Sequence, residues 1–250
     1  MVSVDNIVIG GLQTLTITPQ GPPTTLQLIR EFKLNDYCIT VAASGVDIYV
    51  GTVQGKLLKI DNQGQVQVFG NIGGYIVGLV IHSGALYALN TYTSKIGIFQ
   101  YDLGSGQQVS FWDHADKSDR WGSRMVVTQN QLVVADVTNH RLTIYSLTGQ
   151  LIRHVDCPQI SRNWVSICVS PSNPDVIIVS DNNSSRVFAV NLTTEVVLWT
   201  NSDISSRPQG IVSYGSEYVL VTIRRTTTNI WILNVNTGKM MQNSVDSTLF

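Results

Sequence analysis

The stretch Gln131–Val155, QLVVADVTNHRLTIYSLTGQLIRHV, contains the pattern that the rest of the chain repeats. Leu132–Ala135 is apolar and β-branched, and Arg141–Leu147 alternates apolar with polar residues. Gly149 supplies a turn before a third alternating run, Gln150–Val155. Alternation with a period of two residues, interrupted by turn residues, predicts three antiparallel strands joined by short turns. This stretch is therefore predicted to be a β-meander.

The first strand of this unit recurs along the whole chain at spacings of 38 to 46 residues. The six recurrences start at Ile7, Ile48, Leu86, Leu132, Val176 and Tyr218. A period of about 40 to 45 residues with about four strands is typical of a β-propeller. The sequence thus predicts an all-β fold: a six-bladed β-propeller of four-stranded antiparallel blades, forming a single domain over residues 1–250. The predicted blades lie near residues 6–34, 38–70, 76–112, 125–156, 166–201 and 210–243.

A fourth short run between successive units is predicted to form the innermost strand of each blade, lining a central channel. These runs are Cys38–Ala42, Gly78–Ile81, Met125–Thr128, Ser166–Val169 and Gly210–Ser213. One inner strand is missing from the series, and either Met1–Val4 or Ser244–Phe250 could supply it. We favour the C-terminal segment, because closing one blade with strands from both chain ends removes open sheet edges. A chain that begins almost directly on a strand is also compatible with a domain of a longer polypeptide.

The composition describes a weakly charged globular protein. Charged residues make up 13% and hydrophobic residues 43% of the chain, which excludes a disordered protein. No apolar run approaches the roughly 20 residues that cross a bilayer, and no secretion signal is visible, so we expect no membrane partner. Three cysteines are too few for a disulfide framework and favour a cytoplasmic location. The net charge of −1 provides no basic excess, so DNA is not expected and any RNA site must be a local patch.

The turn Asp136–Arg141, DVTNHR, with Leu142 after it, resembles the NHL repeat, which is named for an Asn-His-Leu tripeptide. Arg207–Val212 resembles the strand entry of that family, and Asp181–Arg186 matches the turn less closely. The resemblance implies a six-bladed propeller of NHL type, most often the C-terminal recognition domain of tripartite-motif (TRIM-NHL) ubiquitin ligases, which binds RNA or protein. The chain departs from the repeat where other residues replace the strand-ending Asp, namely at Gly51, Asn90 and Ile223.

Two acid–arginine pairs share the same i, i+5 spacing across this turn: Asp136 with Arg141, and Asp181 with Arg186. Because the spacing recurs in two blades, we interpret both pairs as blade scaffold, each contributing modestly to stability. His140 belongs to the repeated turn and is not expected to be catalytic.

The predicted binding site lies on one face of the ring. The loops from first to second strand, and from third strand to the next inner strand, share this face, which we call the recognition face. Arginine with tryptophan and tyrosine is the composition of protein-binding hot spots, and the same mixture stacks single-stranded bases. The candidate residues are Arg120, Trp121, Arg124, Arg162, Trp164, Arg207, Arg224, Arg225, Tyr75 and Tyr92. Either tryptophan could instead wedge between adjacent blades.

Enzyme classes have little support in the sequence. Six-bladed lactonases and related hydrolases hold a calcium ion with carboxylates and asparagines at the inner-strand entries, where this chain carries Thr40, Gly78, Arg124, Ser166 and Gly210. Nucleophile-elbow, phosphate-loop and zinc-protease motifs are absent.

We therefore predict a non-enzymatic, monomeric recognition module without cofactor or metal. It would bind a protein partner, for example a ubiquitin-ligase substrate. Single-stranded RNA binding through the same face is the alternative, and a calcium-dependent propeller hydrolase is a second one.

Overall fold

The computed structural model describes residues 5–9, 13–17, 28–32, 34–91, 96–113, 125–162, 164–203, 207–224 and 230–243. Throughout these ranges the chain forms strands and tight turns, without a helix. The all-β prediction is confirmed.

Five antiparallel sheets have four strands each, and the strand order in each sheet follows the order along the chain. The sheets consist of β4 (Cys38–Ser44), β5 (Asp47–Thr52), β6 (Lys56–Ile60) and β7 (Val66–Asn71); β8 (Tyr75–His82), β9 (Ala85–Thr91), β10 (Gly97–Asp102) and β11 (Gln108–Asp113); β12 (Met125–Thr128), β13 (Gln131–Asp136), β14 (Arg141–Ser146) and β15 (Leu151–Asp156); β16 (Val165–Ser170), β17 (Asn173–Asp181), β18 (Arg186–Asn191) and β19 (Val197–Asn201); and β20 (Arg207–Tyr214), β21 (Tyr218–Arg224), β22 (Ile230–Asn234) and β23 (Met240–Asn243).

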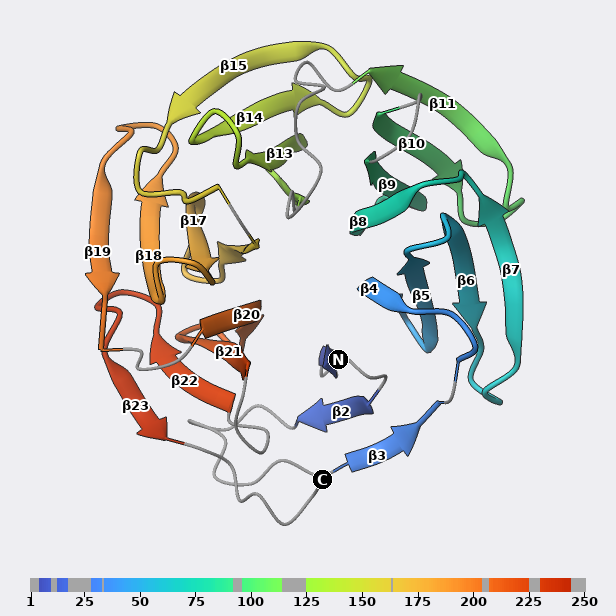
Figure 1. Ribbon diagram of the computed structural model, residues 1–250, viewed down its shortest axis with the longest axis horizontal. Helices are drawn as coiled ribbons and strands as arrows, with labels where there is room; N and C mark the ends of the chain where they lie inside the picture. Colours follow the sequence, from blue (N-terminus) through green and yellow to red (C-terminus); the bar gives the residue numbers. More distant parts are fainter. Residues whose placement is uncertain are drawn as a thin grey trace.

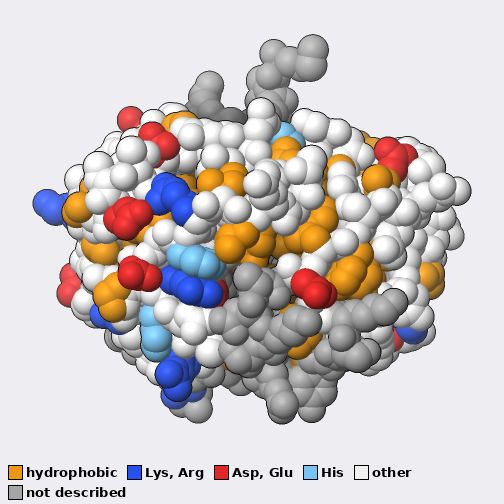
Figure 2. Space-filling view, turned by 90° about the horizontal axis from the view of Figure 1, so that it is seen from above, with side chains coloured by type: hydrophobic (Ala, Val, Ile, Leu, Met, Phe, Trp, Pro, Cys, Tyr) orange, Lys and Arg blue, Asp and Glu red, His pale blue; other side chains and the backbone are white. Residues whose placement is uncertain are grey.

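The sheets stand around a common axis as the blades of a propeller (Figure 1). Strands β4, β8, β12, β16 and β20 are innermost, and consecutive strands of this series contact each other. These are the five segments predicted to line the centre, so that prediction is confirmed. Strands β7, β11, β15, β19 and β23 form the outer rim, part of which Figure 2 shows from the side.

The number of complete blades was predicted wrongly. The N-terminal sheet contains only β1 (Asp5–Ile9), β2 (Gln13–Ile17) and β3 (Leu28–Glu31), so the described residues form five four-stranded blades, not six. β1 occupies the place that β5 has in the next blade, so the described part of this sheet contains no innermost strand. The segments expected to supply it, Met1–Val4 and Ser244–Phe250, lie outside the described residues.

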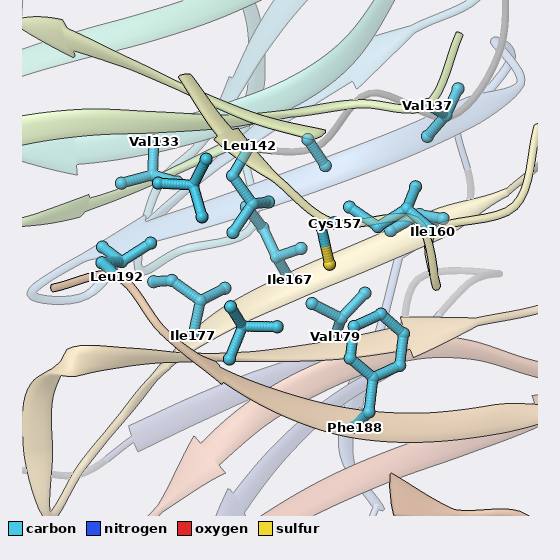
Figure 3. Packing of buried hydrophobic residues seen from close by; sticks show 14 of the residues in the cluster. Val133, Val137, Leu142, Cys157, Ile160, Ile167, Ile177, Val179, Phe188 and Leu192 are labelled. Atoms are coloured by element: carbon cyan, nitrogen blue, oxygen red, sulfur yellow. The ribbon is translucent and has the colours of Figure 1, made fainter. Parts of the chain in front are cut away.

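The hydrophobic core lies between neighbouring blades, because the four-stranded sheets bury side chains on both of their faces. Between the β12–β15 and β16–β19 blades, Val133 and Leu142 face Ile177 and Phe188, all of them fully buried (Figure 3). Full burial of such side chains stabilises by about 1.5–3 kcal/mol each. Packing from blade to blade therefore holds the ring together.

A second contact between blades lies at the rim, where the turn before each outer strand meets the outer strand of the preceding blade. Trp199 of β19 lies against Gly238 in the β22–β23 turn, and its indole N–H donates a hydrogen bond to the carbonyl of Val235 (2.8 Å). A Cβ atom at Gly238 would lie 2.3 Å from Cε3 of Trp199, and its φ of +67° also favours glycine. Trp112 of β11 packs against Gly149 in the β14–β15 turn, without the indole hydrogen bond.

One junction has a different chemistry. Arg153 of β15 stands where these tryptophans stand, and Glu195, with a φ of +60°, occupies the place of the glycine. The Arg153 guanidinium donates to the Glu195 carboxylate (2.9 Å) and to the carbonyl of Leu192 (2.6 Å). An ion pair therefore replaces the aromatic contact at this junction.

Candidate binding face

Half of the predicted binding residues lie on described parts of the recognition face. This face consists of the β5–β6, β9–β10, β13–β14, β17–β18 and β21–β22 turns and the connections from each outer strand to the next blade. Arg162 and Arg207 are exposed, whereas Trp164 and Tyr75 are half-buried. Arg224 ends β21 opposite Arg207 in the strand register. The other candidates lie outside the described residues: Arg120, Trp121, Arg124, Arg225 and Tyr92.

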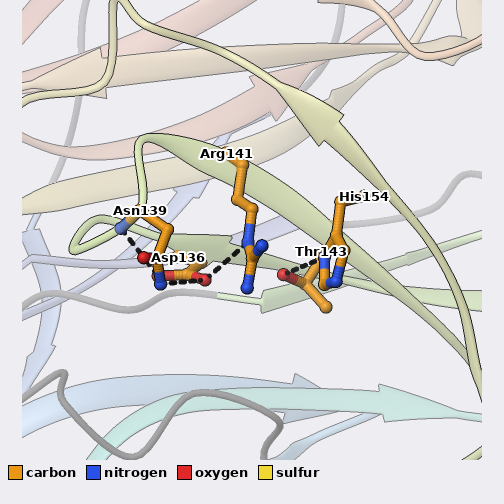
Figure 4. A network of polar contacts seen from close by, with 5 residues as sticks. All are labelled: Asp136, Asn139, Arg141, Thr143 and His154. Atoms are coloured by element: carbon orange, nitrogen blue, oxygen red, sulfur yellow. Dashed lines mark hydrogen bonds and ion pairs between the residues drawn. The ribbon is translucent and has the colours of Figure 1, made fainter.

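The β13–β14 turn is organised around Asp136, whose carboxylate is fully buried (Figure 4). Its Oδ2 accepts from Nε of Arg141 (2.9 Å), and the backbone and side-chain amides of Asn139 also donate to the carboxylate. A buried carboxylate needs such donors to replace the water it has lost. Asp136 and Arg141 thus lie in a network that fixes the shape of the turn.

The second expected pair does not form. Asp181 is also fully buried, but its carboxylate accepts from the backbone N–H and the hydroxyl of Ser161 and from backbone N–H groups of its own turn. Arg186 instead donates to the carbonyl of Gln159 (2.7 Å) and lies over the Phe188 ring. The Ser161 donors come from a loop 20 residues away in the chain, and a spacing of five residues within one turn could not reveal them.

The connection between β15 and β16 is held on both sides. On one side, the carbonyl of His140 accepts from the N–H of Cys157 (2.8 Å), and Nδ1 of His140 bonds to the carbonyl of Ile160. On the other, Ser161 is bound to Asp181. We call residues 157–162 the anchored loop.

Two apolar side chains of the anchored loop, Cys157 and Ile160, are buried between the blades. Burial raises the pKa of the Cys157 thiol to about 11, so this sulfur is a packing group and not a nucleophile at neutral pH. The loop is therefore fixed by apolar burial as well as by hydrogen bonds.

The side chain of Arg162 extends from the end of the anchored loop into solvent, next to His140. The Ile160 carbonyl can only accept, so the bond to it places the ring proton of His140 on Nδ1. Nε2 is then the acceptor, and Nε of Arg162 donates to it (3.4 Å). Among the described residues, no carboxylate forms an ion pair with Arg162. An exposed guanidinium is thus presented from a fixed backbone.

Sequence reasoning missed the partners that fix this loop. The sequence pattern places His140 in the repeated turn, and nothing in the pattern points to Ser161. The repeated turn pattern was visible, but the contact of one blade's turn with the next connection depends on the closed ring. The most exposed aromatic on the described face is Tyr37, which is 70% exposed just before β4.

The described part of the recognition face is not strongly basic. Lys56 is paired with Asp36 (3.1 Å), Arg141 with Asp136, and Arg186 is half-buried against a backbone carbonyl. Arg162 and Arg207 are therefore the described side chains that offer an exposed positive charge there.

The described residues provide no metal centre. No group of three or more His, Cys, Asp or Glu side chains gathers among them in a way that could hold a metal ion. The described inner strands contain no Asp or Glu, so they offer no carboxylate to the centre of the ring. In the same part of the chain, no helix is long and apolar enough to cross a membrane.

Comparison with known proteins establishes the fold class. No protein-family description matches this sequence, and no curated protein matches it. Similar solved structures include a functionally unknown protein from Desulfotomaculum acetoxidans DSM 771 (TM-score 0.68, 12% identity, covering 98% of this chain and 80% of that one). Others are the WD40 β-propeller domain of Doa1 (0.67, 13%, 96% and 78%) and a chain of the mitotic checkpoint complex (0.63, 13%, 96% and 76%).

The architecture and these likenesses together define the protein as a β-propeller with four-stranded antiparallel blades. At identities of 12–13% the likeness concerns the fold alone.

Proposed function

We propose that this propeller is a non-enzymatic module that binds a protein partner through its recognition face. The observation that carries the proposal is the anchored loop, which presents the exposed Arg162, with the half-buried Trp164 two residues later in the sequence. A loop already held in one conformation loses little entropy on binding, and arginine and tryptophan are the residues most enriched in binding hot spots.

The partner segment is expected to carry a carboxylate opposite Arg162. A guanidinium with no described acidic partner gains a charge-assisted hydrogen bond when it meets one. Propellers of similar fold include a chain of the mitotic checkpoint complex, which supports a role in assembly. The absence of carboxylates from the described inner strands argues against a calcium-dependent hydrolase.

The finer assignments are also proposals. Membership of the NHL class rests on the Asp136–Leu142 turn and the Arg207–Val212 strand entry. A role in presenting substrates to a ubiquitin ligase, and a cytoplasmic location, follow from that resemblance and from the composition. RNA binding has less support, because few exposed positive charges lie on the described part of the face.

The test is a selection of peptides from a displayed random library on the immobilised propeller, followed by fluorescence anisotropy with the enriched peptides. We expect acidic peptides, and Arg162→Ala should weaken their binding about tenfold, equivalent to about 1.4 kcal/mol. Lys239→Ala is the matched control, because it removes the same charge from an exposed site in the β22–β23 turn on the opposite face.

Two results would overturn the proposal. One is peptide binding that Arg162→Ala and Lys239→Ala change equally. The other is tight, salt-sensitive binding of a single-stranded RNA pool without any selected peptide, which would make RNA the ligand.

A further inference from the structure

Exposed hydrophobic side chains are concentrated at the rim of the propeller. Of the 11 large hydrophobic side chains exposed among the described residues, nine lie on an outer strand or directly beside one. They are Val66, Val68, Val109, Phe111, Leu151, Ile152, Val196, Leu198 and Met241. Figure 2 shows hydrophobic side chains at the surface of the rim over β11 and β15. Single exposed hydrophobic residues need no explanation, but their frequency on the outer strands makes these strands candidates for an interaction surface.

The outer strands are also sheet edges. Each of β7, β11, β15, β19 and β23 is the terminal strand of its sheet and pairs on one side only. Such an edge can accept a further strand, and proteins usually prevent this with charged side chains, proline or bulges. Here β7 (VQVFGN), β19 (VLWTN) and β23 (MMQN) contain no charged residue or proline.

β7 is the least protected of these edges. No Asp, Glu, Lys or Arg occurs between Asp61 and Lys95, so β7 lies within a long uncharged part of the chain. A bulge interrupts its pairing with β6 near Leu57 and Leu58, but Val66, Gln67 and Val68 pair regularly before it. These three residues are all exposed. They form a short, uncharged and exposed edge.

The lack of charge favours a second copy of this chain as the occupant. When two identical strands pair antiparallel about a two-fold axis, equivalent residues lie opposite or close to one another. At β15 this would bring Arg153 toward its own copy, and at β19 Glu195 and Asp203 flank the strand. At β7 valine and glutamine would meet instead. The net charge of −1 adds little repulsion between copies.

We propose that two copies of this propeller associate through β7, edge to edge and antiparallel, with the side chain of Val68 at the centre of the contact. This differs from the monomer that the sequence suggested. One added strand on each side makes a small interface, so the dimer is weak and forms as concentration rises.

Sedimentation equilibrium over a wide range of protein concentration tests the proposal. Val68→Lys should raise the dimer dissociation constant at least about tenfold, because two lysines would then face each other across the new pair. Val46→Lys is the matched control. Val46 is the same residue type with nearly the same exposed fraction, 66% against 64%, but it lies in the β4–β5 turn.

Both substitutions alter exposed side chains, and circular dichroism will check that the blades remain folded. A monomer at every concentration would overturn the proposal, as would a dimer that survives Val68→Lys or is lost equally with Val46→Lys. If the wild type is monomeric and an added uncharged peptide binds in a Val68-dependent manner, the edge would accept a different protein and the dimer would be rejected.

Discussion

Two junctions at the rim join an outer strand to a turn of the next blade in the same place, but through different side chains. At the junction of β19 with the β22–β23 turn, the indole of Trp199 lies on Gly238 and bonds to the Val235 carbonyl. At the junction of β15 with the β18–β19 turn, Arg153 bonds to the equivalent carbonyl of Leu192 and to Glu195. In both junctions, a side chain of the outer strand donates a hydrogen bond to the carbonyl of the first residue after the third strand of the next blade.

The two junctions differ in how far their side chains are removed from water. Trp199 packs against the apolar cluster between its blade and the next, so it gains from the removal of apolar surface from water. Arg153 and Glu195 have side chains that are 38% and 50% exposed, so water and salt screen their attraction. The aromatic junction should therefore contribute more to stability and respond less to salt.

Among the substitutions at the two junctions, Trp199→Ala should lower the free energy of unfolding the most. It removes a half-buried aromatic side chain and its hydrogen bond, and we expect the free energy of unfolding to fall by about 3 kcal/mol. Trp199→Phe is the control, because it keeps most of the packing and loses only the donor, at a cost of about 1 kcal/mol. Urea unfolding followed by circular dichroism measures both; equal losses would show that the hydrogen bond dominates.

Arg153→Ala should lower the free energy of unfolding by less, about 1 kcal/mol. The ion pair is largely exposed, and one hydrogen bond to the backbone is lost. The loss should shrink when the same unfolding curves are recorded at high salt. A loss that does not depend on salt would mean that Arg153 acts through its alkyl chain, as packing.

Glu195→Gly should change the free energy of unfolding the least, by no more than about 0.5 kcal/mol from the wild type. Glycine relieves the left-handed φ at this position, which offsets the loss of the ion pair. Glu195→Ala loses the pair without that relief and should be the less stable of the two. The opposite order of the two variants in urea would contradict the role assigned to this backbone conformation.

Much of the propeller could be predicted from local pattern. Alternation in segments such as Arg141–Leu147 and the period of the units identified the strands and their order from the centre outward, because each blade is a local meander. The turn glycines Gly149 and Gly238 were visible too, and each is paired in space with an aromatic residue of the preceding blade's outer strand. That regularity could have revealed the rim junctions.

The rest depended on contacts between distant parts of the chain. The spacing within the turn predicts a pair of Asp181 with Arg186, whereas Ser161 reaches that carboxylate from the preceding connection. The anchored loop could not be foreseen, since it bonds to turns of two different blades. The sequence pattern showed that the N-terminal unit lacks an inner strand, but the segments expected to supply that strand, Met1–Val4 and Ser244–Phe250, lie outside the described residues.

The ion pair at the β15 junction has a consequence for how the chain assembles. Blades of similar sequence can dock in the wrong order while a repetitive protein folds, and such misassembly is a characteristic failure of repeats. If the outer strand that carries Trp199 docked on the β18–β19 turn, the indole would clash with the side chain of Glu195, because the indole packs only against a glycine. If the strand that carries Arg153 docked on Gly238, the guanidinium would have no carboxylate to pair with. The different chemistry at this junction therefore disfavours wrong pairings of blades and helps to specify the order of the blades in the ring.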